Sequence, residues 1–204
     1  FNTLFPESRY VTAEDVNTKP EDMHVIRSRT QFVSGVGHGE FDGNPSPYTA
    51  LGVLVAMKTA IGVKTMQGKR VAVSGLGNVG GELARLLHVE GAILWVADVA
   101  EGRAEQVKAQ LGNNVSVVSP ADIHKQDVDV YAPCAMGGCL NTTTIGELKA
   151  KYIVGAANNQ LLDEVKHAQA LKARGILYAP DYVINAGGII NVSCEFLPGG
   201  YDEQ

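Results

Sequence analysis

Arg70-Val-Ala-Val-Ser-Gly-Leu-Gly-Asn-Val-Gly-Gly81 is the stretch that decides the fold, because an apolar strand runs directly into three spaced glycines. The pattern is G-x-G-x-x-G, with glycines at Gly75, Gly77 and Gly80, and helical sequence follows it. We expect Gly75 to permit a tight turn out of the strand and Gly77 to let a phosphate approach the backbone. Gly80 would let the helix lie close to the sheet. Free N–H groups at the start of that helix would then face an anionic ligand.

A second strand supports the same interpretation. Ile93-Leu-Trp-Val-Ala-Asp98 ends in an acid, about 20 residues beyond the glycines. A carboxylate at this point can accept two hydrogen bonds from the ribose hydroxyls of a dinucleotide, and it would repel a 2′-phosphate. A plain strand–turn–helix explains neither the glycine spacing nor the acid. The sequence therefore predicts an NAD site that includes Gly75, Leu76, Gly77, Asn78, Val79, Gly80 and Asp98.

Composition indicates a globular protein and argues against two classes of partner. Hydrophobic residues make up 45% of the 204 residues, enough for a full core, and the net charge of −5 argues against nucleic acid or an anionic membrane. No apolar run approaches the roughly 18 residues that span a bilayer, and no signal-like segment opens the sequence. Cys134, Cys139 and Cys194 lack paired spacing, so we expect reduced thiols, a cytoplasmic protein and no metal site.

From about residue 70, short apolar runs alternate with helical patterns. We expect strands at 71–74, 93–97, 115–118, 128–131, 152–155 and 176–178. The expected helices between them are at 79–89, 101–110, 142–150 and 161–174. This alternation predicts an α/β fold, a doubly wound parallel (Rossmann) sheet with helices on both faces.

The first part of the chain has a different pattern. We expect a short strand at 9–13 and a helix at 20–27. A loop rich in glycine and proline follows at 35–47, and an apolar helix runs from Ser46 or Thr49 to about Ile61. A strand with no partner strand of its own looks like a piece of a larger sheet. We therefore expect residues 1–45 to be the tail and hinge of a preceding α/β domain. Residues 46–204 would be the nucleotide-binding domain.

Three further segments follow expected strands, at the sheet edge where ligands of such folds bind. They are Tyr131-Ala-Pro-Cys-Ala-Met-Gly-Gly138, Gly155-Ala-Ala-Asn-Asn-Gln160 and Ala179-Pro-Asp-Tyr-Val-Ile-Asn-Ala-Gly-Gly188. The small residues of the first allow a ligand to approach closely, and the amides of the second can hold a carboxamide or an amine. Each alone is typical of an ordinary turn. Three of them at the edge that carries the glycine loop favour a nicotinamide and substrate site.

These segments, with two near the start of the chain, carry a family resemblance. The stretches are Tyr10-Val-Thr-Ala-Glu-Asp-Val, Asn44-Pro-Ser-Pro-Tyr-Thr, Gly75-Leu-Gly-Asn-Val-Gly, Ala132-Pro-Cys-Ala-Met-Gly, Gly155-Ala-Ala-Asn-Asn-Gln-Leu and Tyr178-Ala-Pro-Asp-Tyr-Val-Ile-Asn-Ala-Gly-Gly. Together they resemble the Glu/Leu/Phe/Val amino-acid dehydrogenase family, and the branch is similar to the leucine, valine and phenylalanine enzymes. The resemblance implies reversible, NAD-dependent oxidation of an L-amino acid to a 2-oxo acid and ammonia. Glutamate dehydrogenase and a non-catalytic NAD-sensing module are the alternatives.

The resemblance also implies roles for residues of the cofactor site. Thr49 matches a residue near the nicotinamide carboxamide, and Asp98 matches the acid that binds the adenosine ribose. Asn159, the second of its pair, matches the asparagine at the nicotinamide and substrate end. The residues implied to line the cofactor near the nicotinamide ribose are Ala135, Met136 and Gly137.

On the substrate side, the resemblance makes Asp15 the acid that exchanges a proton with the substrate amine. An acid is needed where an amine gains or loses a proton, and the other role for an acid here, at a helix start, suits Asp22 better. Ile189 and Val192 match positions that line the substrate side-chain pocket. They are three residues apart on one face of a short expected helix, although such a spacing is also typical of plain core.

The sequence departs from the family pattern at one important point. The family draws two lysines from its first domain, one to grip the substrate carboxylate and one, in a Gly-Gly-Gly-Lys segment, as catalytic base. Neither segment is present here, and neither are the family's helices after the Gly187-Gly188 segment. We therefore expect a fragment that is inactive alone and belongs to a longer, homo-oligomeric enzyme. A natural short protein would instead favour the NAD-sensing alternative.

Overall fold

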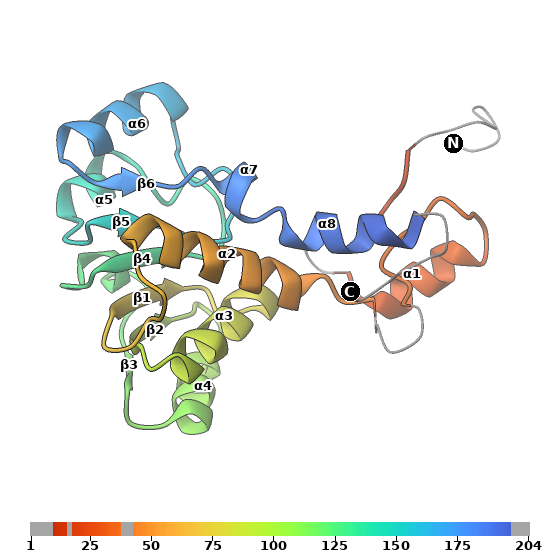
Figure 1. Cartoon of the computed structure of the whole chain (residues 1–204), viewed down its shortest axis with the longest axis horizontal. Coiled ribbons are helices and arrows are strands. Elements are labelled where there is room, and N and C mark those ends of the chain that lie inside the picture. Colours follow the sequence, from red (N-terminus) through yellow and green to blue (C-terminus); the bar gives the residue numbers. More distant parts are fainter. Residues whose placement is uncertain (1–9, 16–17, 38–42, 197–204) are drawn as a thin grey trace. The chain divides into compact units, whose positions relative to one another are not determined.

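The computed structural model describes residues 10–15, 18–37 and 43–196 (Figure 1). The chain divides into two compact units. One unit is formed by residues 49–187, and the other combines residues up to 48 with those from 188 onward. The division at residue 45 that the sequence suggests stays a prediction about the domains of the whole protein.

A six-stranded, all-parallel sheet forms the centre of the larger unit (Figure 1). Its strands are β1 (Arg70–Ser74), β2 (Ile93–Ala97), β3 (Val115–Val117), β4 (Val130–Pro133), β5 (Tyr152–Ile153) and β6 (Leu177–Tyr178). They lie in the order β3-β2-β1-β4-β5-β6, so the direction of winding reverses between β1 and β4. The doubly wound parallel sheet predicted from the sequence is confirmed.

Helical elements pack on both faces of this sheet. The core of one face includes α2 (Ser46–Ile61), α3 (Asn78–Val89) and α4 (Arg103–Leu111), and the core of the other includes η1 (Ile123–Lys125), α5 (Thr142–Glu147) and α6 (Glu164–Ala173). Successive side chains of a strand point to opposite faces. In β1, Val71 and Val73 therefore enter the first core while Ala72 enters the second.

The elements of this unit differ from the expected ones at several boundaries: the helices expected at 142–150 and 161–174 are shorter, and strand β4 is shifted. It begins at Val130, two residues later than predicted, because Asp129 is engaged with Arg70. The Arg70 backbone N–H donates to the Asp129 carboxylate at 2.9 Å, and its guanidinium donates to the same side chain at 3.3 Å. Pairing extends instead to Pro133, which lies opposite Ser74.

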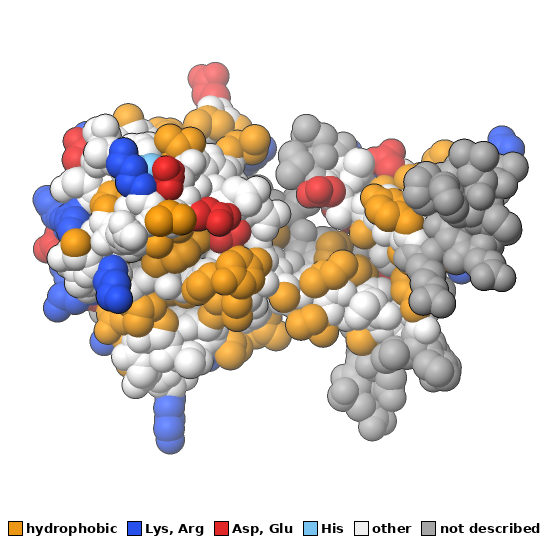
Figure 2. Space-filling model, turned by 90° about the horizontal axis from the view of Figure 1, so that it is seen from above, with side chains coloured by type: hydrophobic (Ala, Val, Ile, Leu, Met, Phe, Trp, Pro, Cys, Tyr) orange, Lys and Arg blue, Asp and Glu red, His pale blue; other side chains and the backbone are white. Residues whose placement is uncertain are grey.

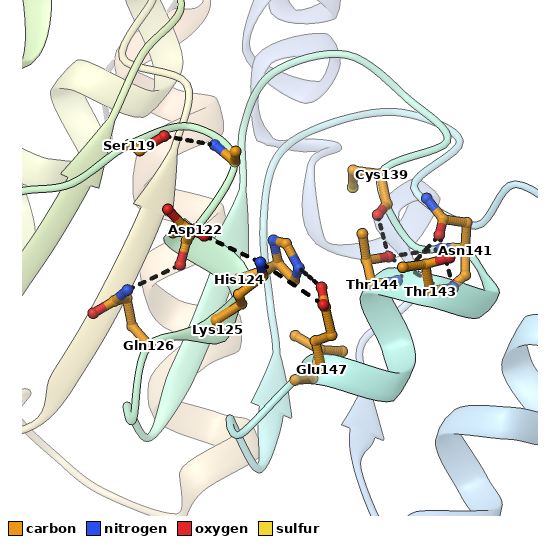
Figure 3. A network of polar contacts seen from close by, with 12 residues as sticks. Ser119, Asp122, His124, Lys125, Gln126, Cys139, Asn141, Thr143, Thr144 and Glu147 are labelled. Carbon is orange, nitrogen blue, oxygen red and sulfur yellow. Dashed lines mark hydrogen bonds and ion pairs between the residues drawn. The ribbon is translucent and has the colours of Figure 1, made fainter.

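A polar network joins η1 to α5 on the second face (Figure 3). His124 Nε2 lies 2.7 Å from a Glu147 carboxylate oxygen, and Lys125 Nζ lies 3.7 Å from the other. Asn141 caps α5 by accepting the backbone N–H groups of Thr143 and Thr144. His124 therefore has a partner, but the contact holds two surface elements together.

The smaller unit differs more from the prediction. It contains α1 (Pro20–Arg27) and η2 (Cys194–Phe196), and most of α8 (Gly187–Ser193). The strand expected at 9–13 is wrong over its described residues, since Thr12 forms only one isolated parallel bridge, with Val33. Arg9 lies outside the described residues. The bridge consists of the Thr12 N–H donating to Phe32 at 3.2 Å and the Ser34 N–H donating to Thr12 at 2.8 Å, too little pairing to make a strand.

The glycine loop brings α3 into direct backbone contact with the end of β1. Gly75 has a φ of +91°, the turn conformation expected for it. A Cβ on Gly80 would collide with the Gly75 carbonyl oxygen and lie 3.0 Å from the Cβ of Cys134. The close approach of helix and strand at Gly80, predicted from the sequence, is confirmed.

Gly80→Ala should therefore lower the free energy of unfolding by about 3 kcal/mol, because the clash involves backbone that cannot move freely. Gly146→Ala is the matched control, since Gly146 is also helical and a Cβ there meets nothing within 4 Å. That change should stabilise the protein by about 0.5–1 kcal/mol through helix propensity. Urea unfolding of both variants measures the two effects, and equal stability of Gly80→Ala and the unaltered chain would contradict the packing argument.

A buried glutamine supports the loop that follows β5. Gln160 is fully buried, and its Nε2 donates to the carbonyl oxygens of Gly155 at 2.7 Å and Ala157 at 2.9 Å. Its Oε1 has no hydrogen-bond partner within the described chain. The side chain thus fixes the shape of the loop from its buried side, where its amide group donates to the loop backbone.

Gln160→Ala should cost about 2–4 kcal/mol of unfolding free energy, since it leaves two carbonyl groups without their donor and opens a cavity. Gln126→Ala removes a similar bond, from Nε2 to the Asp122 carbonyl at 2.9 Å, at an exposed site. That control should change stability by less than about 0.5 kcal/mol. Thermal unfolding of Gln160→Ala and Gln126→Ala tests the difference, and similar midpoints would show that the Gln160 side chain does not stabilise the loop after β5.

Candidate cofactor site

The carboxyl edge of the sheet gathers the glycine loop and the segments that follow β2, β4, β5 and β6. This follows from the topology, because parallel strands bring all their carboxyl ends to one edge. The winding reversal between β1 and β4 leaves a crevice position there, which is where such sheets bind ligands.

The open side of the glycine loop is at Gly77. Gly77 precedes the first residue of α3 and has an ordinary φ of −67°, and a Cβ built on it would meet no atom within 4 Å. The fold therefore does not itself require glycine there. A group that approaches the backbone from outside would require it, and the N–H groups at the start of α3 suit an anion. Leu76 turns its side chain into the core, and Val79 packs against the same core, while Asn78 is exposed.

Asp98 follows β2 and is tied to the glycine loop. Its carboxylate accepts the Leu76 N–H at 2.6 Å and the Ala100 N–H at 2.7 Å, and Arg103 Nη1 lies 3.3 Å from both oxygens. Burial acts to raise the pKa of Asp98, but the two backbone N–H groups and the charge of Arg103 outweigh it. The pKa is held below its usual value, so the group is an anion at neutral pH.

The segment after β4 lies against the glycine loop. A Cβ on Gly75 would fall 2.7 Å from the Cβ of Ala135, so the two loops touch. A Cβ on Gly137 would fall 2.7 Å from the Asn158 carbonyl oxygen, so the same segment also touches the loop after β5. Met136 between them is exposed.

Asn159 stands out in the loop after β5. Among the described residues it is the one non-glycine with a positive φ, 52°, a conformation that asparagine tolerates better than most. Its backbone is held on both sides, because its N–H donates to Asp181 at 2.8 Å and its carbonyl accepts from Gly138 at 2.8 Å. Its exposed side-chain amide makes no hydrogen bond with the described chain, which leaves it available to a ligand.

The segment after β6 contains residues that the sequence analysis missed. Part of it is helix α7 (Asp181–Ile184), although the sequence of this segment is typical of a turn. Asp181 accepts from Tyr178 Oη at 2.7 Å as well as from the Asn159 backbone, and Asn185 Nδ2 donates to the Ala156 carbonyl at 3.1 Å. The only signal was an acid one residue after Pro180, at a helix start. Through these hydrogen bonds the two residues shape the Asn159 loop.

The remaining predicted residues lie elsewhere. Thr49, half-buried, is in the first turns of α2. In the smaller unit, Asp15 is exposed, and its backbone N–H donates to Thr18 Oγ1 at 2.8 Å. Val192 is 3% exposed and Ile189 63% exposed, so in this structure the expected pocket pair does not share one environment.

The histidines and thiols carry no reactive arrangement in the described chain. His167 is buried: its Nδ1 accepts the Asp163 N–H at 3.0 Å, and its Nε2 lies 3.2 Å from Thr142 Oγ1. The cysteines are free, and burial raises the pKa of Cys134 to about 12 and that of Cys139 to about 11. Within residues 10–15, 18–37 and 43–196, no three His, Cys, Asp or Glu side chains converge as metal ligands. None of the helices described there is long and apolar enough to cross a bilayer.

Comparison with known proteins places this edge in a family. Residues 45–102 and 93–199 match the model of glutamate/leucine/phenylalanine/valine dehydrogenase. The chain is 49% identical over 200 residues to an L-tryptophan dehydrogenase of Nostoc punctiforme, with 96% of this chain and 55% of the relative covered. It is 48% identical over 201 residues to a leucine dehydrogenase of Bacillus subtilis, with 96% and 54% covered.

A solved structure agrees with these matches. The crystal structure of L-tryptophan dehydrogenase from Nostoc punctiforme superposes with a TM-score of 0.81 at 46% identity, covering 97% of this chain and 56% of that one. The chain spans about half the length of the relatives it matches. The match of the family model over most of the sequence, together with these identities, shows that the chain belongs to the glutamate/leucine/phenylalanine/valine dehydrogenase family.

Proposed function

We propose that the chain supplies the NAD-binding part of a dehydrogenase that reversibly converts an L-amino acid with an apolar side chain to a 2-oxo acid and ammonia. The observation that carries the proposal is the open side of Gly77, at an edge where the loops after β4 and β5 and helix α7 contact one another. Family membership supports the reaction class. The relatives named above are leucine and tryptophan dehydrogenases, which supports an apolar substrate over glutamate.

The residues would divide the cofactor between them. The backbone from Gly75 to Gly80, at the positive end of α3, would hold the pyrophosphate, and Asp98 would hold the adenosine ribose. The amide of Asn159 would bind the nicotinamide end, with Thr49 and the 135–137 segment lining it. Bound NAD would supply the hydride acceptor. The part of this chain is then to fix its two ends and to favour it over NADP through the charge of Asp98.

The substrate side of the proposal rests on Asp15, Ile189 and Val192. Asp15 would exchange a proton with the amine, a role that an exposed carboxylate at the end of a short segment can fill. The two apolar residues would contribute to the side-chain pocket. The two family lysines have no counterpart here, so we propose that they lie in another part of a longer protein and that the 204-residue chain alone does not turn over amino acids.

We also propose that the full-length enzyme is a homo-oligomer. Leu162, Val165, Tyr182 and Val183 of the sheet unit are each more than half exposed. Hydrophobic side chains gather between the charged ones on the face of this unit seen in Figure 2. Exposed apolar surface of this kind is typical of surfaces that associate.

The cofactor proposal is tested by titrating the 204-residue chain with NADH. Binding is expected for the unaltered chain. Gly77→Ala should weaken it at least about tenfold, because the added methyl group occupies the space a pyrophosphate would enter. Its unfolding midpoint should not fall, since the Cβ meets no protein atom. Gly146→Ala serves again as the control and should bind normally. Equal affinity of Gly77→Ala and the unaltered chain would exclude this loop as the phosphate site.

The role of Asp15 is tested in the full-length enzyme. Asp15→Asn should lower kcat at least about 100-fold and leave the Kd for NADH nearly unchanged, because the residue acts on the amine and not on the dinucleotide. Asp22→Asn removes the same charge from an acid that accepts the Lys19 N–H at the start of α1, and should keep its rate. A near-normal kcat for Asp15→Asn would refute the assignment. Comparing leucine, tryptophan, phenylalanine and glutamate as substrates separates the glutamate alternative, and absence of turnover with all four would favour an NAD-sensing module.

A further inference from the structure

The acid at the end of β2 is covered by an arginine. Arg103 Nη1 lies 3.3 Å from both carboxylate oxygens of Asp98. The Asp98 side chain is 5% exposed, whereas that of Arg103 is 47% exposed. The group that meets solvent at this point of the edge is therefore a guanidinium cation and not the carboxylate behind it.

The hydrogen bonds of Asp98 leave little capacity for a ligand. A carboxylate has about four acceptor sites. Two are used by the N–H groups of Leu76 and Ala100, and Arg103 spans the remaining side of the carboxylate. A ribose diol can reach Asp98 only if Arg103 swings away, and Arg103 can do so because its side chain is half-exposed and bonded to no other residue of the described chain.

The backbone determines where Arg103 lies. It is the first residue of α4, and Gly102 before it has a φ of +75°, a turn that brings the chain back toward the end of β2. The five-residue path from Asp98 to Arg103 is thus folded so that the side chains at its two ends face each other. Arg85 is also a half-exposed arginine, but it lies on another helix, α3, and pairs there with Glu82 and not with Asp98.

We propose that Arg103 is a specificity-determining residue for the cofactor, which limits the preference for NAD by shielding Asp98 and by offering a cation to the 2′-phosphate of NADP. The inference rests on the proposed NAD site. A guanidinium presents paired N–H donors that match a phosphate, so Arg103 can bind the 2′-phosphate while it stays beside Asp98. For NAD the same arginine is a competitor, because the ribose hydroxyls and the guanidinium seek the same carboxylate. One side chain thus acts in opposite directions on the two cofactors.

The test is the ratio of two dissociation constants, Kd for NADPH over Kd for NADH, measured by fluorescence titration of the 204-residue chain. Arg103→Gln should raise this ratio about tenfold, since it removes a charge-assisted contact to the 2′-phosphate and exposes the carboxylate. The Kd for NADH itself should stay equal or fall. Arg103→Lys, which keeps the charge but not the paired donors, should give a smaller increase.

Arg85→Gln is the matched control, because it removes the same charge and also breaks an ion pair at the protein surface. It should leave the ratio unchanged, which separates a local effect of Arg103 from the change in net charge. A parallel change of both dissociation constants in Arg103→Gln would overturn the inference while leaving the proposed NAD site intact. Failure of the unaltered chain to bind either cofactor would overturn both. Unfolding midpoints close to that of the unaltered chain are expected for all three variants, since both arginines are about half-exposed.

Discussion

The backbone contact between Gly75 and Gly80 is the constraint on which the rest of this edge depends. Helix α3 can begin where it does only because no side chain separates its first turn from the end of β1. That position aims the N–H groups of α3 past the strand ends and leaves Gly77 on the open side. The neighbouring loops are built against the same turn, since Ala135 rests on Gly75 and Asp98 accepts the Leu76 N–H. A larger side chain at Gly80 would displace the helix and with it the anion-binding end.

Much of the fold could be predicted because its signals are local. Glycine spacing, short apolar runs and the helical patterns between them are read within a window of a few residues, and each of the six strands was expected close to its observed position. The errors occur where a residue far away in the sequence determines the local structure. β4 starts late because Asp129 bonds to Arg70, 59 residues away. The segment at 10–13 has strand-like composition but finds only Val33 as a partner, so a single bridge forms.

The candidate site shows the same division. Its loops could be placed at one edge from topology alone, since parallel strands end together, and the structure brings those loops into contact. The supporting side chains could not be predicted. Asp181 and Asn185 support a loop more than twenty residues earlier in the chain, and the residues around them indicate a helix start but not this contact. From the sequence, Arg103 is an ordinary residue at a helix start, and only the turn at Gly102 brings it to Asp98. His167 lies on a helix, and the burial of its ring follows from contacts with Thr142 and Asp163 that the sequence does not indicate.

The hydrogen bond from Leu76 to Asp98 has a consequence for how cofactor preference can change during evolution or design. Asp98 serves two purposes, since the same carboxylate that would bind a ribose also ties down the phosphate loop. Replacing Asp98 with a neutral residue would make room for the 2′-phosphate of NADP, but it would also remove the acceptor of the Leu76 N–H and loosen the phosphate loop. Such a change would weaken the binding of NAD and of NADP alike. Position 103 has no such second role, because within the described chain Arg103 makes no hydrogen bond to the phosphate loop. Substitutions at position 103 could therefore shift the preference between NAD and NADP while the hydrogen bond that holds the phosphate loop stays in place.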